Sequence, residues 1–164
     1  MNNKELEKKV KQFVSELSYQ KGYVTSVDVL LKLGYLTQTD YQNWRLGKIE
    51  YLEKVCNTNL QKLSTVNKLI RKFAAEWNLE ASWTGYNRFG KGPKKRLIFS
   101  KTRDSKIEYA YATHYLNKKR IIELKREKQI KNSARTDTIT NKPGTDQLHD
   151  LDKIATTTQH GRLG

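Results

Sequence analysis

Apolar residues recur at helical spacing in the first part of the chain. The first set predicts an amphipathic helix that ends at Gly22 and has on its apolar face Leu6, Val10, Phe13, Val14 and Leu17. Thr25 or Ser26 then caps a short helix that ends at Gly34. Thr39 and Gln42 fit a capping box, which predicts a third helix that ends near Gly47.

A longer amphipathic helix is predicted over 60–77. Its apolar side consists of Leu63, Val66, Ile70, Phe73, Ala74 and Trp77. The opposite side contains almost only hydrogen-bond donors and cations, and its candidate binding residues are Lys62, Thr65, Lys68, Arg71 and Lys72. A polar side of this kind is typical either of a solvated helix or of a helix that contacts an anionic partner.

The pattern changes after residue 78 to β-forming residues. Ser82–Phe89 and Arg96–Lys101 are predicted to form a β-hairpin, because Gly90 to Pro93 between them is a cluster of turn residues. Ser105 then begins a long helix that we expect to continue to residue 131 and to be strongly basic beyond Leu116. Residues 132–164 have almost no apolar side chains and are predicted to be disordered.

The order of these elements predicts the fold class. We expect a mainly α protein with one β-hairpin (α+β), built as a winged helix-turn-helix-like domain over 1–116 with its hairpin at about 82–101. The basic C-terminal helix over 105–131 and the disordered tail follow it. In such a domain the helix before the hairpin enters the major groove of DNA, and the hairpin reaches flanking phosphates.

Positive charge is concentrated in one part of the sequence. Residues 83–131 contain 15 Lys and Arg against 4 Asp and Glu, a balance of +11 within a net charge of +15. Coulomb attraction and counterion release would give such a segment affinity for a polyanion, most simply nucleic acid. Besides the helix over 60–77, the candidate phosphate-binding residues are Lys91, Lys94, Lys95 and Arg96 at the hairpin tip, and Lys118, Lys119, Arg120, Lys125 and Arg126 in the C-terminal helix.

The aromatic segment that begins at Trp83 allows a second interpretation. Trp83 and Phe89 are expected to pack against helices, whereas Tyr86 and Arg88 either pack as well or stack on unpaired bases. Duplex DNA is favoured, for a protein acting as a regulator or accessory factor. RNA binding, alone or on the ribosome, remains an alternative.

A further alternative is a module that docks on an acidic protein, as an antitoxin or inhibitor would. The candidate contacts are Trp44, Arg45 and Tyr51, because Trp, Tyr and Arg are enriched at interface hot spots, or the 132–164 tail, which could fold on binding.

The remaining composition argues against several classes of chemistry. Cys56 is the only cysteine and the three His are scattered, so we expect no disulfide, no metal site and no cofactor. No catalytic set with a defined geometry is present, and a non-enzymatic protein is expected, with a small nuclease as the minor alternative. No apolar run reaches the ~18 residues of a membrane span, so we predict a cytoplasmic protein that associates with the nucleoid if it binds DNA.

Overall fold

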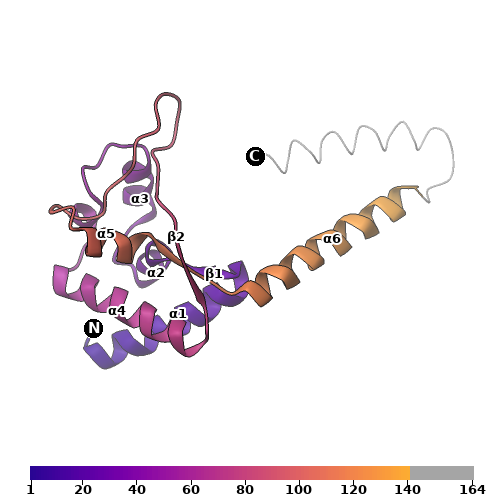
Figure 1. Cartoon of the computed structure of the whole chain (residues 1–164), viewed down its shortest axis with the longest axis horizontal. Helices are drawn as coiled ribbons and strands as arrows, with labels where there is room; N and C mark the ends of the chain where they lie inside the picture. The colour runs from indigo at the N-terminus through magenta and orange to yellow at the C-terminus, as the bar shows by residue number, and fades with distance from the viewer. Residues whose placement is uncertain (141–164) are drawn as a thin grey trace. The chain divides into compact units, whose positions relative to one another are not determined.

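The computed structural model describes residues 1–140, with side chains described up to residue 135. The chain divides into two units, Met1–Ile122 and Glu123–Gly164. The first unit is a mainly helical domain with a small antiparallel sheet, so the predicted α+β class is confirmed (Figure 1).

Three helices of the first unit form its framework: α1 (Asn3–Lys21), α2 (Ser26–Leu33) and α4 (Leu60–Glu76). Their ends are determined locally. The side chains of Asn2, Thr25 and Asn59 accept hydrogen bonds from the first turns of α1, α2 and α4. Gly22 and Gly34 end α1 and α2 in the left-handed conformation, with φ of 82° and 78°. The predicted bounds of these helices are therefore confirmed to within a few residues.

Two shorter helices lie between α2 and α4. They are α3 (Gln38–Arg45) and the 3-10 helix η1 (Leu52–Val55). The side chain of Thr37 caps α3 by accepting a bond from the Asp40 N–H, so the capping box predicted at Thr39 is wrong.

The sheet differs from the predicted hairpin. Its strands are β1 (Tyr23–Val24), β2 (Glu80–Trp83) and β3 (Thr113–Leu116), in the order β1-β3-β2 with both pairs antiparallel. The start of the segment predicted as the first hairpin strand, Ser82 and Trp83, therefore pairs with His114 and Thr113 of β3 instead. Of the predicted hairpin, a single bridge between Asn87 and Arg96 remains, flanked by backbone bonds from Leu97 to Tyr86 and from Arg88 to Lys95.

The helix predicted over 105–131 is broken in the structure. It divides into α5 (Ser105–Ala112), β3 and α6 (Lys118–Thr140). Thr113–Leu116 is extended rather than helical because it forms the central strand of the sheet and pairs with a strand on each side. Asn117 fixes the change of direction: its N–H donates to Gly22 O, and its Oδ1 accepts from Arg120 N at the start of α6. Residues 132–140, predicted as disordered, belong to α6, and 141–164 lie outside the described residues.

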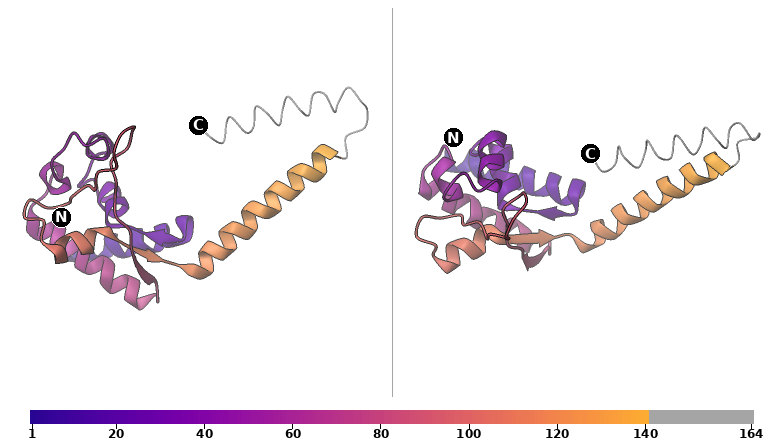
Figure 2. Two further views of the ribbon diagram at one scale, coloured as in Figure 1. Left: turned by 45° about the horizontal axis from the view of Figure 1, so that its top comes forward. Right: turned by 90° about the horizontal axis from the view of Figure 1, so that it is seen from above.

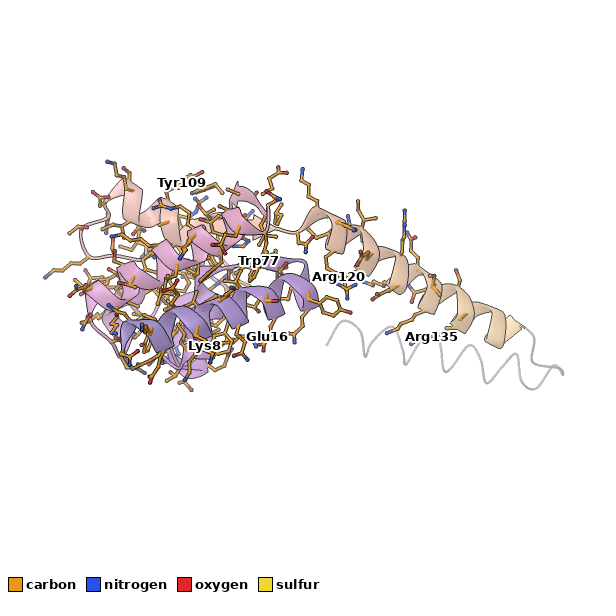
Figure 3. The ribbon with its side chains drawn as sticks, turned by 90° about the horizontal axis from the view of Figure 1, so that it is seen from below. Lys8, Glu16, Trp77, Tyr109, Arg120 and Arg135 are labelled. Carbon is orange, nitrogen blue, oxygen red and sulfur yellow. The ribbon has the colours of Figure 1, made fainter. Side chains whose placement is uncertain are left out.

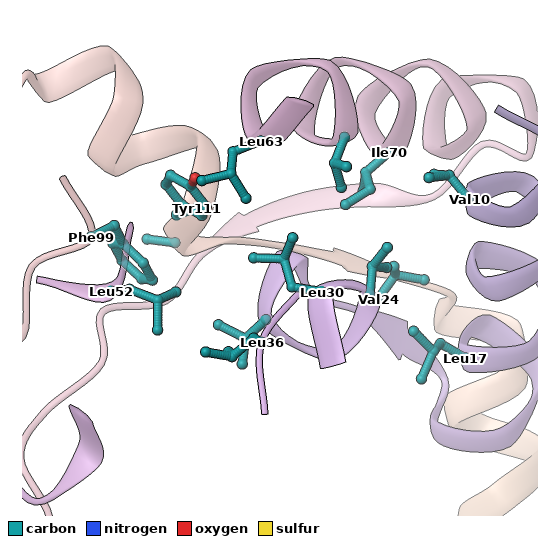
Figure 4. Packing of buried hydrophobic residues seen from close by; sticks show 14 of the residues in the cluster. Val10, Leu17, Val24, Leu30, Leu36, Leu52, Leu63, Ile70, Phe99 and Tyr111 are labelled. Atoms are coloured by element: carbon teal, nitrogen blue, oxygen red, sulfur yellow. The ribbon is translucent and has the colours of Figure 1, made fainter. Parts of the chain in front are cut away.

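The core joins α1, α2, α4 and the sheet to an aromatic cluster. Figure 4 shows Val10, Leu30 and Ile70 converging from the three framework helices, with Phe99 and Tyr111 at the other side of the core. Trp44 of α3 is fully buried between Tyr86 and Phe99, with ring centroids 5.4 and 5.1 Å away. The long connection between β2 and β3 thus supplies part of the core.

The carboxylate of Glu108 in α5 fixes this connection. It accepts hydrogen bonds from the N–H groups of Phe99 and Ser100, at 2.8 and 2.9 Å, and from the Ser100 hydroxyl at 2.7 Å. Both donor residues are 2% exposed, so water cannot replace the carboxylate without local opening.

We therefore expect Glu108→Ala to lower the free energy of unfolding by about 2–4 kcal/mol, because it leaves buried N–H groups without an acceptor. Urea denaturation measures this loss. Glu50→Ala, which removes an exposed ion pair with Lys54, is the control and should change stability by less than about 0.5 kcal/mol. Equal losses in the free energy of unfolding for the two variants would contradict the role of Glu108 in holding this connection.

Candidate nucleic-acid interface

The outer face of α4 is polar and open to solvent. Leu63, Val66, Ile70, Phe73 and Ala74 are buried, and this leaves Gln61, Ser64, Lys68 and Arg71 on the exposed side. Figure 3 looks onto this side and shows α4 between α1, which includes Lys8 and Glu16, and α5, which includes Tyr109. A ligand that contacts α4 therefore meets α1 and α5 at its two edges.

Four of the five candidate residues of α4 fall into two groups. Lys62 and Lys72 lie at the α1 edge: Lys62 Nζ donates to Met1 O at 2.8 Å, and Lys72 Nζ pairs with Glu7 at 2.9 Å. The hydrogen bond with Glu7 raises the pKa of Lys72. Thr65 donates to Gln61 O within the helix. Lys68 and Arg71 instead line the other edge of α4, next to α5.

A groove of about 840 Å³ separates α4 from α5. Lys68 and Arg71 line it from α4, and Lys106 lines it from α5. Its apolar lining is partly exposed, with Leu60 at 65% and Tyr109 at 54%. The groove thus combines cations with apolar surface along the whole of α5.

Glu53 and Tyr111 belong to the same groove and are bonded to each other. The Tyr111 hydroxyl donates to the Glu53 carboxylate at 2.7 Å. Burial raises the pKa of Glu53, and burial together with Glu53 raises the pKa of Tyr111. Burial raises the pKa of the nearby Cys56 thiol to about 12, so this thiol stays protonated at neutral pH and is a poor nucleophile.

The cationic tip of the predicted hairpin lies away from α4. Phe89 N–H donates to Arg45 O at the end of α3, and the stem of Arg88 lies against Gly47. Figure 1 shows the connection that follows β2 reaching beyond α3 at the top, whereas α4 lies at the bottom. Lys91, Lys94, Lys95 and Arg96 at this tip are exposed. The element beside α4 is therefore α5, and the tip lies on the α3 side of the first unit.

Tyr86 and Arg88 do not form the exposed stacking face that the sequence allowed. Tyr86 is 8% exposed and packs edge-on against Phe99 and His114. The guanidinium of Arg88 donates to Lys91 O. Trp83 and Phe89, which were expected to pack, are instead 50% and 42% exposed. The expectation that Trp83 and Phe89 pack is therefore wrong, and of the two alternatives left open for Tyr86 the structure shows packing.

The docking patch that the sequence allowed around Trp44 as an alternative is internal in part. Trp44 is completely buried and donates from Nε1 to Ile98 O. The Arg45 guanidinium lies 3.9 Å from the ring centre of Phe89 and 5.0 Å from that of Tyr86. Tyr51 is half-buried where η1 begins. Trp44 is therefore an anchor of the fold rather than a contact for a partner.

The cations of α6 belong to both units. In the first unit, Lys118 pairs with Glu80 at 2.7 Å, Lys119 is exposed, and Arg120 donates to Tyr19 O at 2.7 Å. In the second unit, Lys125 and Arg126 are exposed.

Among the residues that the structure describes, no group of three or more His, Cys, Asp or Glu side chains could hold a metal ion. Within residues 1–140, no helix is both long and apolar enough to cross a membrane. No family model, curated protein or solved structure matches the chain.

His114 lies in the aromatic cluster rather than in a catalytic set. Its ring stacks on Tyr23 at 5.8 Å and meets the edge of Tyr86 at 5.7 Å. Its Nε2 is buried and has no hydrogen-bond partner among the described residues. Burial lowers the pKa of His114, so the folded protein favours the neutral ring.

A lowered pKa in the folded state predicts a loss of stability in acid. The contribution of neutral His114 is complete above its unfolded pKa of about 6.5 and is lost as the pH falls through its lower folded pKa. We expect the free energy of unfolding to decrease over this interval, and to decrease less in His114→Phe. Urea denaturation at pH 5.0 and 7.5 tests this expectation, and an equal decrease in both proteins would contradict it.

Proposed function

We propose that the protein binds double-stranded DNA, without catalysing a reaction, through the outer face of α4. The observation on which this proposal rests is the exposed row of Gln61, Ser64, Lys68 and Arg71, on a helix whose other side is fixed in the core. Such a helix presents donors and cations in a rigid arrangement, which both base-edge and phosphate contacts require.

The order of elements supports a winged-helix type of domain. α1, α2 and α4 form a three-helix framework, and β2 follows α4 directly and pairs with β3, which separates it from β1 (Figure 2). In helix-turn-helix proteins the helix in the position of α4 enters the major groove, and its N-terminal residues contact base edges. By this comparison, Gln61 and Ser64 would meet bases, and α5 would occupy the flank that a wing usually takes.

Positively charged side chains lie along both edges of α4, where they could contact the phosphates of the two DNA strands. Lys68, Arg71 and Lys106 lie along the groove with α5, and Lys62 and Lys72 lie along α1. The first turn of α4 contains no acidic residue that would repel a phosphate. Each contact with a phosphate releases counterions, so the affinity should fall steeply with salt.

The proposal predicts the behaviour of Lys68→Ala/Arg71→Ala. In a fluorescence-anisotropy titration with a random 20-base-pair duplex, we expect about tenfold weaker binding or more at 50 mM salt, because two cations at the groove edge are lost. We also expect the slope of log K against log salt to be about two units shallower.

A matched control removes two positive charges elsewhere. Lys32 and Lys54 form exposed pairs with Glu16 and Glu50 and lie outside α4 and its groove. Lys32→Ala/Lys54→Ala should change the affinity much less than the α4 variant and should leave the salt slope within about half a unit of wild type. Equal losses in the two double variants would show that net charge, rather than α4, determines binding.

A further inference from the structure

A second exposed surface lies on the connection between β2 and β3. Trp83 at the end of β2 is 50% exposed, and Phe89 is 42% exposed. Large aromatic side chains that are this exposed to solvent on a small domain indicate a contact surface more often than single exposed aliphatic side chains do. Trp83 also lies on an edge strand, since β2 has a strand neighbour on one side only.

Each of the two rings has an arginine against it. The Arg96 guanidinium lies 4.8 Å from the ring centre of Trp83, and that of Arg45 lies 3.9 Å from the ring centre of Phe89. Arg96 is held in place because its Nε donates to Asn87 Oδ1 at 3.1 Å. It also fills the space where a side chain at Gly85 would lie. The rings are therefore oriented by fixed cations and keep much of their surface open.

The charge of this segment has one sign. Residues 81–103 contain seven Lys and Arg and no Asp or Glu. Lys91, Lys94 and Lys95 are exposed at the tip, next to Phe89 in sequence. Seven cations without a local counter-charge favour an anionic ligand, and two open rings favour a ligand with flat aromatic groups.

We propose that this aromatic–cation surface, formed by Trp83, Phe89, Arg96, Lys91, Lys94 and Lys95, binds single-stranded nucleic acid. Unpaired bases would stack on Trp83 and Phe89, and the lysines would contact phosphates. A duplex keeps its bases stacked on each other and cannot use the rings in this way. The tip of the connection lies beyond α3 at the top of Figure 1, whereas α4 lies at the bottom, so the lysines of this surface are separate from the proposed duplex site.

The test uses the full chain and fluorescein-labelled 12-nucleotide probes, oligodeoxythymidylate and oligouridylate, at 50 mM salt. A length of 12 nucleotides lies within the usual range of about 4–16 for one site. We expect Trp83→Ala/Phe89→Ala to weaken binding at least tenfold. Lys94→Ala/Lys95→Ala should make the salt slope shallower by about 1.4 units, from two single-strand phosphate contacts.

Two matched controls separate this site from general effects. Trp77→Ala removes another partly exposed tryptophan, 38% exposed and stacked on Phe73, and should leave the affinity within twofold of wild type. Lys68→Ala/Arg71→Ala, the variant that tests duplex binding, should also retain single-strand binding. The proposal is overturned if neither probe binds, or if Trp83→Ala/Phe89→Ala binds like wild type. It is also overturned if the α4 variant is the one that loses the probes.

Competition distinguishes bases from charge alone. Poly-L-glutamate offers anionic groups without bases and should displace the probes far less well than unlabelled oligonucleotide at equal charge. Equal displacement would overturn the stacking proposal in favour of an acidic protein partner. Tighter binding of one probe than the other assigns the site to DNA or to RNA, and either assignment supports the proposal.

Discussion

The structure depends on how the connection between β2 and β3 is held at Ile98 and Phe99. Structureless loops longer than about 12–15 residues are uncommon in compact domains. The part of this connection before α5, residues 84–104, contains no helix or strand of the sheet, and several of its side chains are packed into the core. Ile98 O accepts from Trp44 Nε1 and Leu52 N, and Phe99 O accepts from Glu53 N. These bonds tie the connection to the α3–η1 segment, and Glu108 ties it to α5. They hold the middle of the connection, between the cationic tip and α5, against the rest of the first unit.

This anchoring separates two cationic surfaces that a simple hairpin would have joined. The backbone hydrogen bond between Phe89 and Arg45 holds the tip beside α3, whereas α5 lies beside α4. One surface is a rigid helix flanked by cations, which suits a duplex. The other is an extended segment with open rings and no acidic residue, which suits unpaired bases. A protein with both would favour nucleic acid in which duplex and single strand adjoin.

Local signals in the sequence predicted the helices well and the strands poorly. α1, α2 and α4 were found because a cap and the helical periodicity belong to each segment, and because glycines end α1 and α2. β1 and β3 were missed because they are two and four residues long and depend on partners far away in sequence. For the site, Lys68, Arg71 and Lys72 lie on the exposed side of α4, as the helical periodicity predicted, and Lys62 is half-buried. Trp83 and Phe89 were wrongly expected to pack, and the position of Tyr86 was left open, because alternation alone cannot show which side meets Trp44.

The most direct test of the two-surface account is a ¹H–¹⁵N NMR titration of the full chain with a short blunt duplex and, separately, with oligodeoxythymidylate. The account predicts that the duplex shifts amide signals of α4, the start of α1 and α5, while signals of 86–96 stay in place. Oligodeoxythymidylate should instead shift the signals of Trp83 and of 86–96. If both ligands shift the same signals, or if the duplex acts only on 86–96, the assignment of duplex binding to α4 is contradicted.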